Sequence, residues 1–384
     1  MTQIKNGMVC NPDCTGFEKR DLFFRDGVIV EAEHDRIPDR VIDAEGSYVI
    51  PGLIDIHTHG VVGVDYAAPD DFSGALLFEA GQGVTTVIPT VSTRAEQGML
   101  ADIRHIADQC RRGLPGACIG GIHLEGPFIS AEKRGAMPIS GLECTLARWR
   151  RLYEAGEGLI RLMTIAPELV NALDVIRDGV KKGVRMSLGH TGATYGEAMA
   201  GIEAGATGAT HTFNAMRPYG HRDPGVLGAV LTDARVDCEV ICDMIHLSPV
   251  TVELIRRAKG VDGMILISDS GYGTGLAEGE YQNNHGQTEV VKDGVIRLPS
   301  GVIFGSGYTA ADGARKLMGI GFTLAEIARV GALNPARAVG LDPDRGSIRT
   351  GKRADLILCD GSMNLKRVFV YGKEMPLSPQ AFRL

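Results

Sequence analysis

The sequence predicts an α/β fold, namely a (β/α)8 TIM barrel with a small β-sandwich domain built from both chain termini. Eight short apolar runs alternate with helical segments between about residues 50 and 270, a pattern typical of βα-repeated folds. Short β-rich segments separated by turns occupy both ends of the chain. We therefore expect residues 1–50 and 344–384 to form the small domain and residues 51–343 to form the barrel.

Length and composition agree with this division. A chain of 384 residues exceeds the usual size of one compact core. A net charge of -7 argues against general binding to nucleic acid or to an anionic membrane, so we expect a small-molecule partner. The eight cysteines are scattered without a C-x-x-C pair, and the first residues lack the apolar core of a signal peptide. The expected location is the cytoplasm.

The expected barrel strands are short, rich in β-branched or aliphatic residues, and end at a turn or a polar residue. They cover residues 53–57, 85–91, 117–125, 159–166, 184–190, 208–214, 238–243 and 263–269.

Helix signals lie between and after these runs. Apolar residues recur at helical spacing over residues 99–110, and Gly113 follows as a stop. Thr194 with Glu197, and Thr323 with Glu326, have the spacing of capping boxes that begin helices. At the chain ends, residues 21–24, 28–30, 40–43, 47–50, 351–360 and 368–372 read as strands with turns.

Two histidines stand at the end of the first barrel strand. Residues i and i+2 of a strand point to the same side, so His57 and His59 would project into one space. A lone His-x-His is a weak signal, because such histidines often have structural roles.

The ends of four further predicted strands have residues of the types that bind metal ions. They are Glu125, His190, His211 and Asp269. Catalytic groups of a (β/α)8 barrel lie at the carboxyl ends of its strands, and imidazoles and carboxylates are suitable ligands for Zn²⁺ or Fe²⁺. We therefore expect these side chains to converge on a divalent metal site.

Motifs along nearly the whole chain resemble the amidohydrolase superfamily, and more narrowly its N-acetylglucosamine-6-phosphate deacetylases. HLEGPF at 123–128 and HTFNAM at 211–216 are specific for the deacetylase branch. The remaining matches are PGLIDIHTHG (51–60), GHTGA (189–193), HRDPG (221–225), DMIH (243–246), ISD (267–269), NPARAVGL (334–341) and GSIRTGKRADLIL (346–358).

This resemblance implies roles for individual residues. Glu125, His190 and His211 would hold the main metal ion, His57 and His59 a second, and the number of ions, one or two, stays open. Asp269 would be the general base and acid. Sugar or phosphate contacts would come from Ala136, Asn214, Ala215, Arg222, His246, Ile303, Phe304 and Gly305. In this family the arginine of HRDPG reaches a neighbouring subunit's site, so the resemblance implies a homodimer with Arg222 near the partner's site.

Each of these residues would have a defined role in the hydrolysis of an amide. A metal ion lowers the pKa of bound water from 15.7 to about 7 and polarises a carbonyl. Asp269 would take the proton of that water and return it to the amide nitrogen as the C–N bond breaks. Arg222 would pair with an anionic group of the sugar, and His246 would donate to a hydroxyl or to the developing oxyanion.

Departures from the family pattern cluster in the substrate loops, at residues 270–275 and 304–309 and at Met137. The exact substrate therefore stays open among N-acetylglucosamine 6-phosphate, N-acetylgalactosamine 6-phosphate and a 6-sulfonated analogue.

Three other readings remain. A hydantoinase-like hydrolase would bring a bridging lysine on the fourth strand, but residues 159–168 contain no lysine. An adenosine-type deaminase fits poorly with Glu125 on the third strand and with HTFNAM. A barrel that binds a sugar phosphate without efficient turnover is the non-enzymatic alternative, against which the presence of Asp269 argues.

Overall fold

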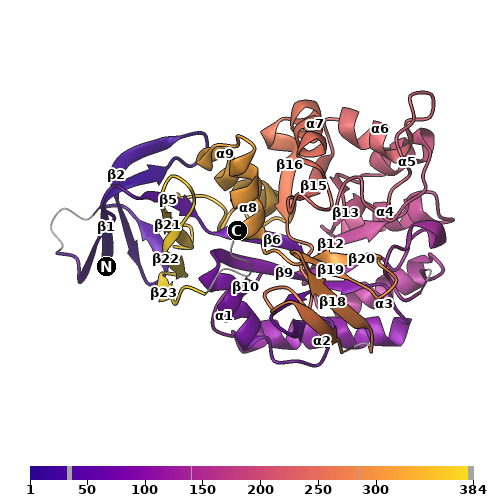
Figure 1. The fold of residues 1–384 in the computed structure, drawn as a ribbon, viewed down its shortest axis with the longest axis horizontal. Coiled ribbons are helices and arrows are strands. Elements are labelled where there is room, and N and C mark those ends of the chain that lie inside the picture. Colours follow the sequence, from indigo (N-terminus) through magenta and orange to yellow (C-terminus); the bar gives the residue numbers. More distant parts are fainter. Residues whose placement is uncertain (33–36, 140, 285, 379–384) are drawn as a thin grey trace.

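The computed structural model describes residues 1–32, 37–139, 141–284 and 286–378. The last six residues of the predicted small domain therefore lie outside the described residues. Figure 1 shows the strands of both chain ends together on one side and the barrel with its helices on the other. The predicted fold class is confirmed. The exact domain limits at residues 50 and 344 stay a prediction.

Eight parallel strands form the barrel. They follow one another around it in chain order, and an additional short strand, β10 (Cys118–Ile119), pairs with β9. The barrel strands are β6 (Leu53–Thr58), β9 (Val84–Ser92), β11 (Ile122–Glu125), β12 (Ile160–Ile165), β13 (Arg185–Leu188), β14 (Gly208–Ala209), β15 (Asp237–Ile241) and β16 (Met264–Ile267).

Backbone hydrogen bonds beyond the regular ladders close the barrel between its first and last strands. The N–H of Asp269 donates to the carbonyl of His57 at 2.9 Å, and the N–H of His59 donates to the carbonyl of Ser270 at 2.8 Å. The closure thus uses residues at or just beyond the carboxyl ends of β6 and β16, and it brings the first and last barrel strands together at one mouth.

One helix follows each barrel strand, as expected for this fold. These helices are α1 (Ser73–Gly81), α2 (Glu96–Arg112), α3 (Leu146–Ala155), α4 (Ala172–Lys181), α5 (Tyr195–Glu203), α6 (Gly225–Thr232), α7 (Pro249–Lys259) and α8 (Ala310–Gly319). α2 ends at Gly113 in the left-handed conformation, and α5 begins at the capping box of Thr194 and Glu197, both as predicted.

Two helices after the barrel continue the chain back to the small sheet. α9 (Leu324–Ala328) begins at the predicted capping box of Thr323 and Glu326, and α10 (Asn334–Ala338) follows a π-helical turn. Ala336, Val339 and Leu341 pack in one cluster with apolar residues of five barrel strands. Because side chains from so many strands meet only in the barrel interior, this cluster fills the interior.

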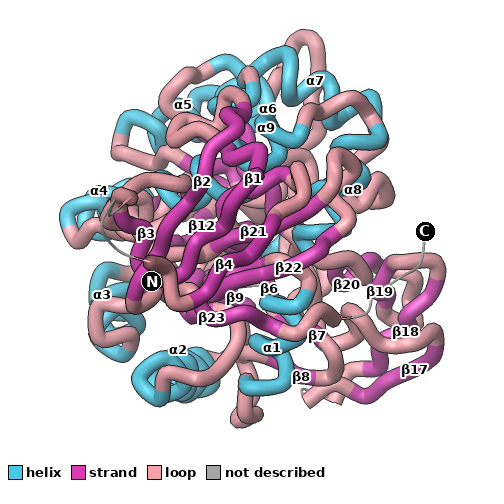
Figure 2. The backbone as a smooth tube through the Cα atoms, turned by 90° about the vertical axis from the view of Figure 1, so that its left-hand side faces the viewer, coloured by secondary structure: helices cyan, strands magenta, loops and turns pink. Residues whose placement is uncertain are grey.

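The chain ends share one eight-stranded sheet. β1 pairs with β4 along its first half and with β5 further on, so the sheet branches at β1. Figure 2 looks onto these strands, with the barrel behind them. Their bounds are β1 (Thr2–Cys10), β2 (Phe17–Arg25), β3 (Val28–Val30), β4 (Arg40–Asp43), β5 (Tyr48–Pro51), β21 (Leu356–Cys359), β22 (Leu365–Val370) and β23 (Lys373–Met375).

An antiparallel insertion follows the last barrel strand and lies beside the barrel mouth. It is a four-stranded sheet of β17 (Gly279–Gln282), β18 (Thr288–Lys292), β19 (Val295–Arg297) and β20 (Ile303–Ser306). A small hairpin, β7 (Gly60–Val61) with β8 (Val64–Asp65), follows the first barrel strand. Among the described residues, no helix has the length and hydropathy needed to cross a bilayer.

Candidate active site

The predicted metal ligands lie together at the carboxyl ends of five barrel strands. His57 is the second-last residue of β6, and Glu125 is the final residue of β11. His190, His211 and Asp269 each come two residues after the end of β13, β14 and β16. The convergence that the sequence analysis predicted is therefore present in the structure.

Three of these residues have a positive φ, a backbone conformation that residues other than glycine rarely adopt. φ is +46° at His190, +29° at His211 and +52° at Asp269. A non-glycine residue in this region costs on the order of 1–3 kcal/mol and persists only where the surrounding structure holds it. The backbone thus turns sharply after each strand and directs these side chains into the barrel mouth.

Glu125, His190 and His211 form the first group of potential ligands. Oε1 of Glu125 lies 3.0 Å from Nε2 of His190 and 3.1 Å from Nε2 of His211, and the two nitrogens are 3.0 Å apart. All three side chains are nearly inaccessible to solvent.

His57, His59 and Asp269 form the second group. Nε2 of His57 and Nε2 of His59 are 3.3 Å apart, and both lie 3.3–3.4 Å from Oδ1 of Asp269. Glu125 touches this group too, with Oε1 3.3 Å from His57 and Oε2 3.4 Å from His59. Its carboxylate is thus shared by both groups.

These distances fit a metal centre. Atoms bound to one tetrahedral ion at about 2.0–2.2 Å are separated by about 3.4 Å, close to the 3.0–3.4 Å seen within each group. Four imidazoles and two carboxylates crowded at this spacing also present more lone pairs than they can satisfy among themselves. The donor set therefore suits one or two divalent cations.

Burial and charge shift the pKa values of these groups in opposite directions. Burial alone would raise the pKa of Glu125, but His57, His190 and His211 hold it well below its usual range. The pKa of Asp269 is likewise lowered by His57 and His59 against the effect of burial. For His57, burial acts to lower the pKa, but the two carboxylates raise it well above 6.5. Asp269 is therefore held in its ionised form, which can accept a proton.

A cavity of about 740 Å³ opens over these ligands. It is lined by ligands of both groups together with most of the residues predicted to contact the substrate. Those on its walls are His59, Glu125, His190, His211, Asp269, Ala136, Asn214, Ala215, His246, Ile303, Phe304 and Gly305. His57 is fully buried next to the cavity and does not line it.

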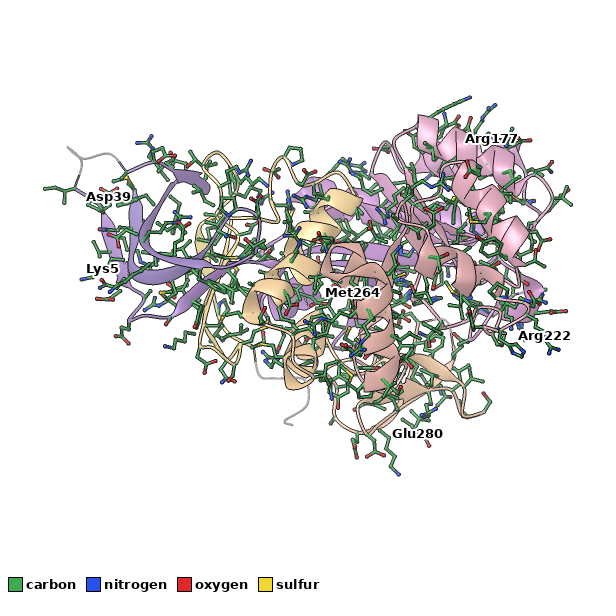
Figure 3. The ribbon with its side chains drawn as sticks, turned by 90° about the horizontal axis from the view of Figure 1, so that it is seen from above. Lys5, Asp39, Arg177, Arg222, Met264 and Glu280 are labelled. Atoms are coloured by element: carbon green, nitrogen blue, oxygen red, sulfur yellow. The ribbon has the colours of Figure 1, made fainter. Side chains whose placement is uncertain are left out.

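Arg222 is placed differently from the other predicted substrate residues. It is exposed on the loop before α6 and does not line the cavity. Figure 3 shows it at the end of the molecule opposite Lys5 and Asp39, with its side chain directed outward.

His246 and Asp243 form a closely paired unit in the cavity wall. Nδ1 of His246 donates to Oδ2 of Asp243 at 2.6 Å, and this carboxylate also accepts the backbone N–H groups of Ile245 and His246. Burial opposes protonation of the imidazole, but Asp243 raises the pKa of His246 above its ordinary value. When the imidazole is protonated, Nε2 is a second hydrogen-bond donor of this unit.

The cavity also has polar residues that the sequence did not single out. Tyr272, Gln287 and Glu289 line it, and Glu289 is fixed by the N–H of Gly273 at 3.1 Å and by Asn283 at 2.9 Å. Glu289 belongs to the β17–β20 insertion. A single glutamate between turn and strand residues carries no motif, so no sequence signal identified it.

The described cavity walls contain no lysine, and β12 contains none either. The hydantoinase-like alternative therefore lacks its bridging ligand at this position.

Comparisons with known proteins show what the whole chain is similar to. Residues 48–375 match the model of the Amidohydrolase family. The chain is 33% identical to N-acetylgalactosamine-6-phosphate deacetylase of Escherichia coli O157:H7, covering 93% of this chain and 94% of that protein. It is also 33% identical to N-acetylglucosamine-6-phosphate deacetylase of Bos taurus, over 92% and 91%. A solved structure of a mutant Mycobacterium smegmatis N-acetyl-D-glucosamine-6-phosphate deacetylase, in complex with N-acetyl-D-glucosamine-6-phosphate, superposes with a TM-score of 0.88 at 32% identity, over 97% and 98% of the two chains.

Proposed function

The chain belongs to the amidohydrolase family, and on this premise we propose that it is a metal-dependent deacetylase of an N-acetylhexosamine 6-phosphate. N-acetylglucosamine 6-phosphate is the proposed substrate, and the products are the amino sugar phosphate and acetate. One observation carries the proposal. Glu125, His190 and His211 line the same cavity as Asp269, and this cavity is large enough for a sugar phosphate.

For the metal, we propose that Glu125, His190 and His211 hold a Zn²⁺ or Fe²⁺ ion. His57 and His59 hold a second ion with Asp269 beside them, and the contacts of Glu125 with both groups support this arrangement. A bound metal lowers the pKa of water to about 7 and polarises the amide carbonyl.

The proton transfers are assigned to Asp269. Its lowered pKa keeps it ionised, so it can take the proton of the attacking water. The amide nitrogen is a poor leaving group until it is protonated. The carboxylic acid form of Asp269 returns the proton to this nitrogen as the C–N bond breaks, and the carboxylate is regenerated.

Substrate orientation is assigned to the other cavity residues. Nε2 of His246 faces the cavity as a donor to a sugar hydroxyl or to the oxyanion. Contacts with the sugar or its phosphate are assigned to Ala136, Asn214 and Ala215 and to Ile303, Phe304 and Gly305 of β20, all of which line the cavity.

We further propose a homodimer in which Arg222 binds the phosphate in the partner's site. Its exposure, its outward direction and its absence from the cavity walls of its own chain support this role. A mixture of Arg222→Ala and Asp269→Asn chains tests it. Exchanged subunits would restore one site with both residues intact, and so part of the activity. A mixture no more active than the sum of its parts would rule out sharing of Arg222.

N-acetylgalactosamine 6-phosphate is the second candidate substrate, because a relative at 33% identity carries that activity in its name. A 6-sulfonated sugar is a further candidate substrate. The loops at 270–275 and 304–309 depart from the family pattern next to the substrate, whereas the metal ligands follow the pattern. A catalytically weak binding barrel remains the non-enzymatic candidate.

The scattered free thiols favour a cytoplasmic location.

A substrate panel separates these candidates. Acetate release is measured from N-acetylglucosamine, N-acetylgalactosamine and N-acetylmannosamine, each with no group, a phosphate or a sulfonate at C6. We expect the highest kcat/KM with N-acetylglucosamine 6-phosphate and at least tenfold less without the anion. A maximum with the galacto epimer or the sulfonate would select that substrate instead. Binding of a sugar phosphate without acetate release would favour the binding barrel.

A further inference from the structure

Each histidine of the site uses Nε2 towards the potential metal, so its Nδ1 faces away from the centre. In two of the four, a neutral oxygen contacts this second nitrogen. Nδ1 of His59 lies 3.0 Å from Oγ of Ser92, and Nδ1 of His190 lies 2.7 Å from the carbonyl oxygen of Lys133. A proton held on Nδ1 leaves the lone pair of Nε2 free for a metal ion.

His57 is held differently. Its Nδ1 is fully buried and has no hydrogen-bond partner among the described residues. Oε2 of Glu239 is also buried without a hydrogen-bond partner, and it lies 3.8 Å from that nitrogen. A buried donor and a buried acceptor that lack partners are each costly, so the two gain most by satisfying one another.

Glu239 comes from the middle of β15, where a carboxylate is unusual between Cys238 and Val240. It is inaccessible to solvent. Its other oxygen, Oε1, accepts a hydrogen bond from Oγ of Ser187 at 3.1 Å. Hence one end of the carboxylate is fixed by Ser187 of β13, and the other end points to His57.

Ser187 is in turn part of a buried hydrogen-bonded chain under the site. Oγ1 of Thr210 donates to Ser187 at 2.7 Å, and Thr210 lies 2.9 Å from Oγ1 of Thr164. Thr164 is 2.9 Å from Nε2 of His123, whose Nδ1 lies 3.2 Å from Oγ1 of Thr90. His123 is thereby engaged at both nitrogens and is no ligand, and the chain limits the freedom of Glu239.

We propose that Glu239 is a positioning residue that fixes the tautomer and orientation of His57, and thereby sets the affinity of the second metal ion. This deepens the proposed function, since it rests on a metal held by His57 and His59. His211 provides the internal contrast, because its Nδ1 has no hydrogen-bond partner in the described part of the chain. Within the site, only His57 has a carboxylate in this outer position among the contacts described.

Metal titration of Glu239→Gln tests the proposal. The amide keeps the size of the side chain and an oxygen for Ser187 but removes the negative charge that faces His57. Metal-free protein is titrated with Zn²⁺ in competition with a chromophoric chelator, which gives the affinity of each site. Inductively coupled plasma mass spectrometry gives the number of zinc ions bound per chain. We expect the second ion to bind about 10- to 100-fold more weakly, with the first ion unchanged.

Glu79→Gln is the matched control. Glu79 is a second fully buried glutamate, on α1, and its carboxylate oxygens have no hydrogen-bond partner among the described residues. It is not among the potential metal ligands or the cavity walls, so this variant should bind both ions as the wild type does. In a His57→Ala background, Glu239→Gln should have no further effect on zinc affinity.

Three outcomes would overturn the proposal. They are a wild type that binds one ion only, an unchanged second ion in Glu239→Gln, and an equal loss in the His57→Ala background. Equal weakening of both ions together with a lowered Tm would show a merely structural role. No substrate enters the titration, so its result is independent of whether the chain releases acetate.

Discussion

The backbone N–H of Asp269 donates to the carbonyl oxygen of His57 at 2.9 Å, and Oδ1 of Asp269 lies 3.4 Å from Nε2 of the same histidine. One pair of residues thus closes the barrel and brings a carboxylate within reach of the metal ligands. A catalytic site at this seam depends on the strand pairing that completes the fold, so small displacements of β6 against β16 would change its geometry.

Replacing Asp269 by asparagine should separate catalysis from metal binding. Asp269→Asn removes the proton acceptor, and we expect kcat to fall by about 10²- to 10⁴-fold. Zinc at Glu125, His190 and His211 should remain, because their contacts do not include Asp269. Steady-state acetate release and metal counting measure both. Asp65→Asn, a second carboxylate of the cavity wall, serves as control. A near-normal kcat in Asp269→Asn would remove the assigned role.

Arg222→Ala should act on substrate binding through the anion. A charge-assisted hydrogen bond contributes about 1.5–3 kcal/mol, which corresponds to roughly 10- to 100-fold in KM for the 6-phosphate. The neutral sugar should be nearly unaffected. Arg104→Ala, at an exposed arginine of α2, is the control. Equal effects on the charged and the neutral sugar would mean that Arg222 does not bind the phosphate.

The pH dependence of KM should report the pair of His246 and Asp243. Because Asp243 raises the pKa of His246, the imidazole stays protonated above the ordinary pKa of 6.5, and its stabilising charge is lost only as pH rises through the raised value. N-acetylglucosamine 6-sulfate keeps a constant charge and is the substrate to use. KM should rise at high pH, and in Asp243→Asn this rise should move to lower pH. An unchanged profile in the variant would contradict the coupling.

The interior of the barrel should dominate stability. Leu162 of β12 is fully buried in the cluster that fills the interior, and Leu162→Ala should lower the free energy of unfolding by about 2–5 kcal/mol. Leu254→Ala, at a half-exposed position of α7, should cost far less. Urea unfolding followed by circular dichroism gives both values. Similar losses at the two sites would show that the cluster is not closely packed.

Much of the fold followed from local chemistry in the sequence. The eight apolar runs became the barrel strands, since β-branched residues bounded by turns suit buried parallel strands. The third run splits into β10 and β11, because it contains Gly120 and Gly121. A Cβ at Gly120 would lie 2.8 Å from Cγ2 of Thr86, so this segment approaches β9 closely.

The sixth run is shorter than predicted, since β14 ends at Ala209. His211, Phe213 and Ala215 all have positive φ, so the segment turns into the site instead of extending as a strand. The signal for this was the change from the small residues Gly208 and Ala209 to the more polar sequence T-H-T-F-N. In this segment the sharp backbone turns that direct His211 into the site replace the extended strand that the sequence predicted.

The candidate site was predictable where residues recur at strand ends, as for His57, His59 and Glu125. Glu239 was missed, although a lone carboxylate inside the apolar run C-E-V-I-C was a usable signal. The insertion of β17–β20 and its Glu289 had no such signal, because their positions depend on contacts distant in sequence. Strand β1 was missed because Lys5 and Asn6 interrupt its alternation.

Removal and return of the metal test the central claim most directly. The enzyme is assayed for acetate release from N-acetylglucosamine 6-phosphate and N-acetylgalactosamine 6-phosphate before chelation, after chelation and after stepwise return of Zn²⁺ or Fe²⁺. The account predicts release that disappears with the metal and returns with it, whereas Glu125→Gln does not recover at the same metal concentration. Acetate release that persists in the metal-free protein, or none from either sugar in the fully loaded one, would contradict it.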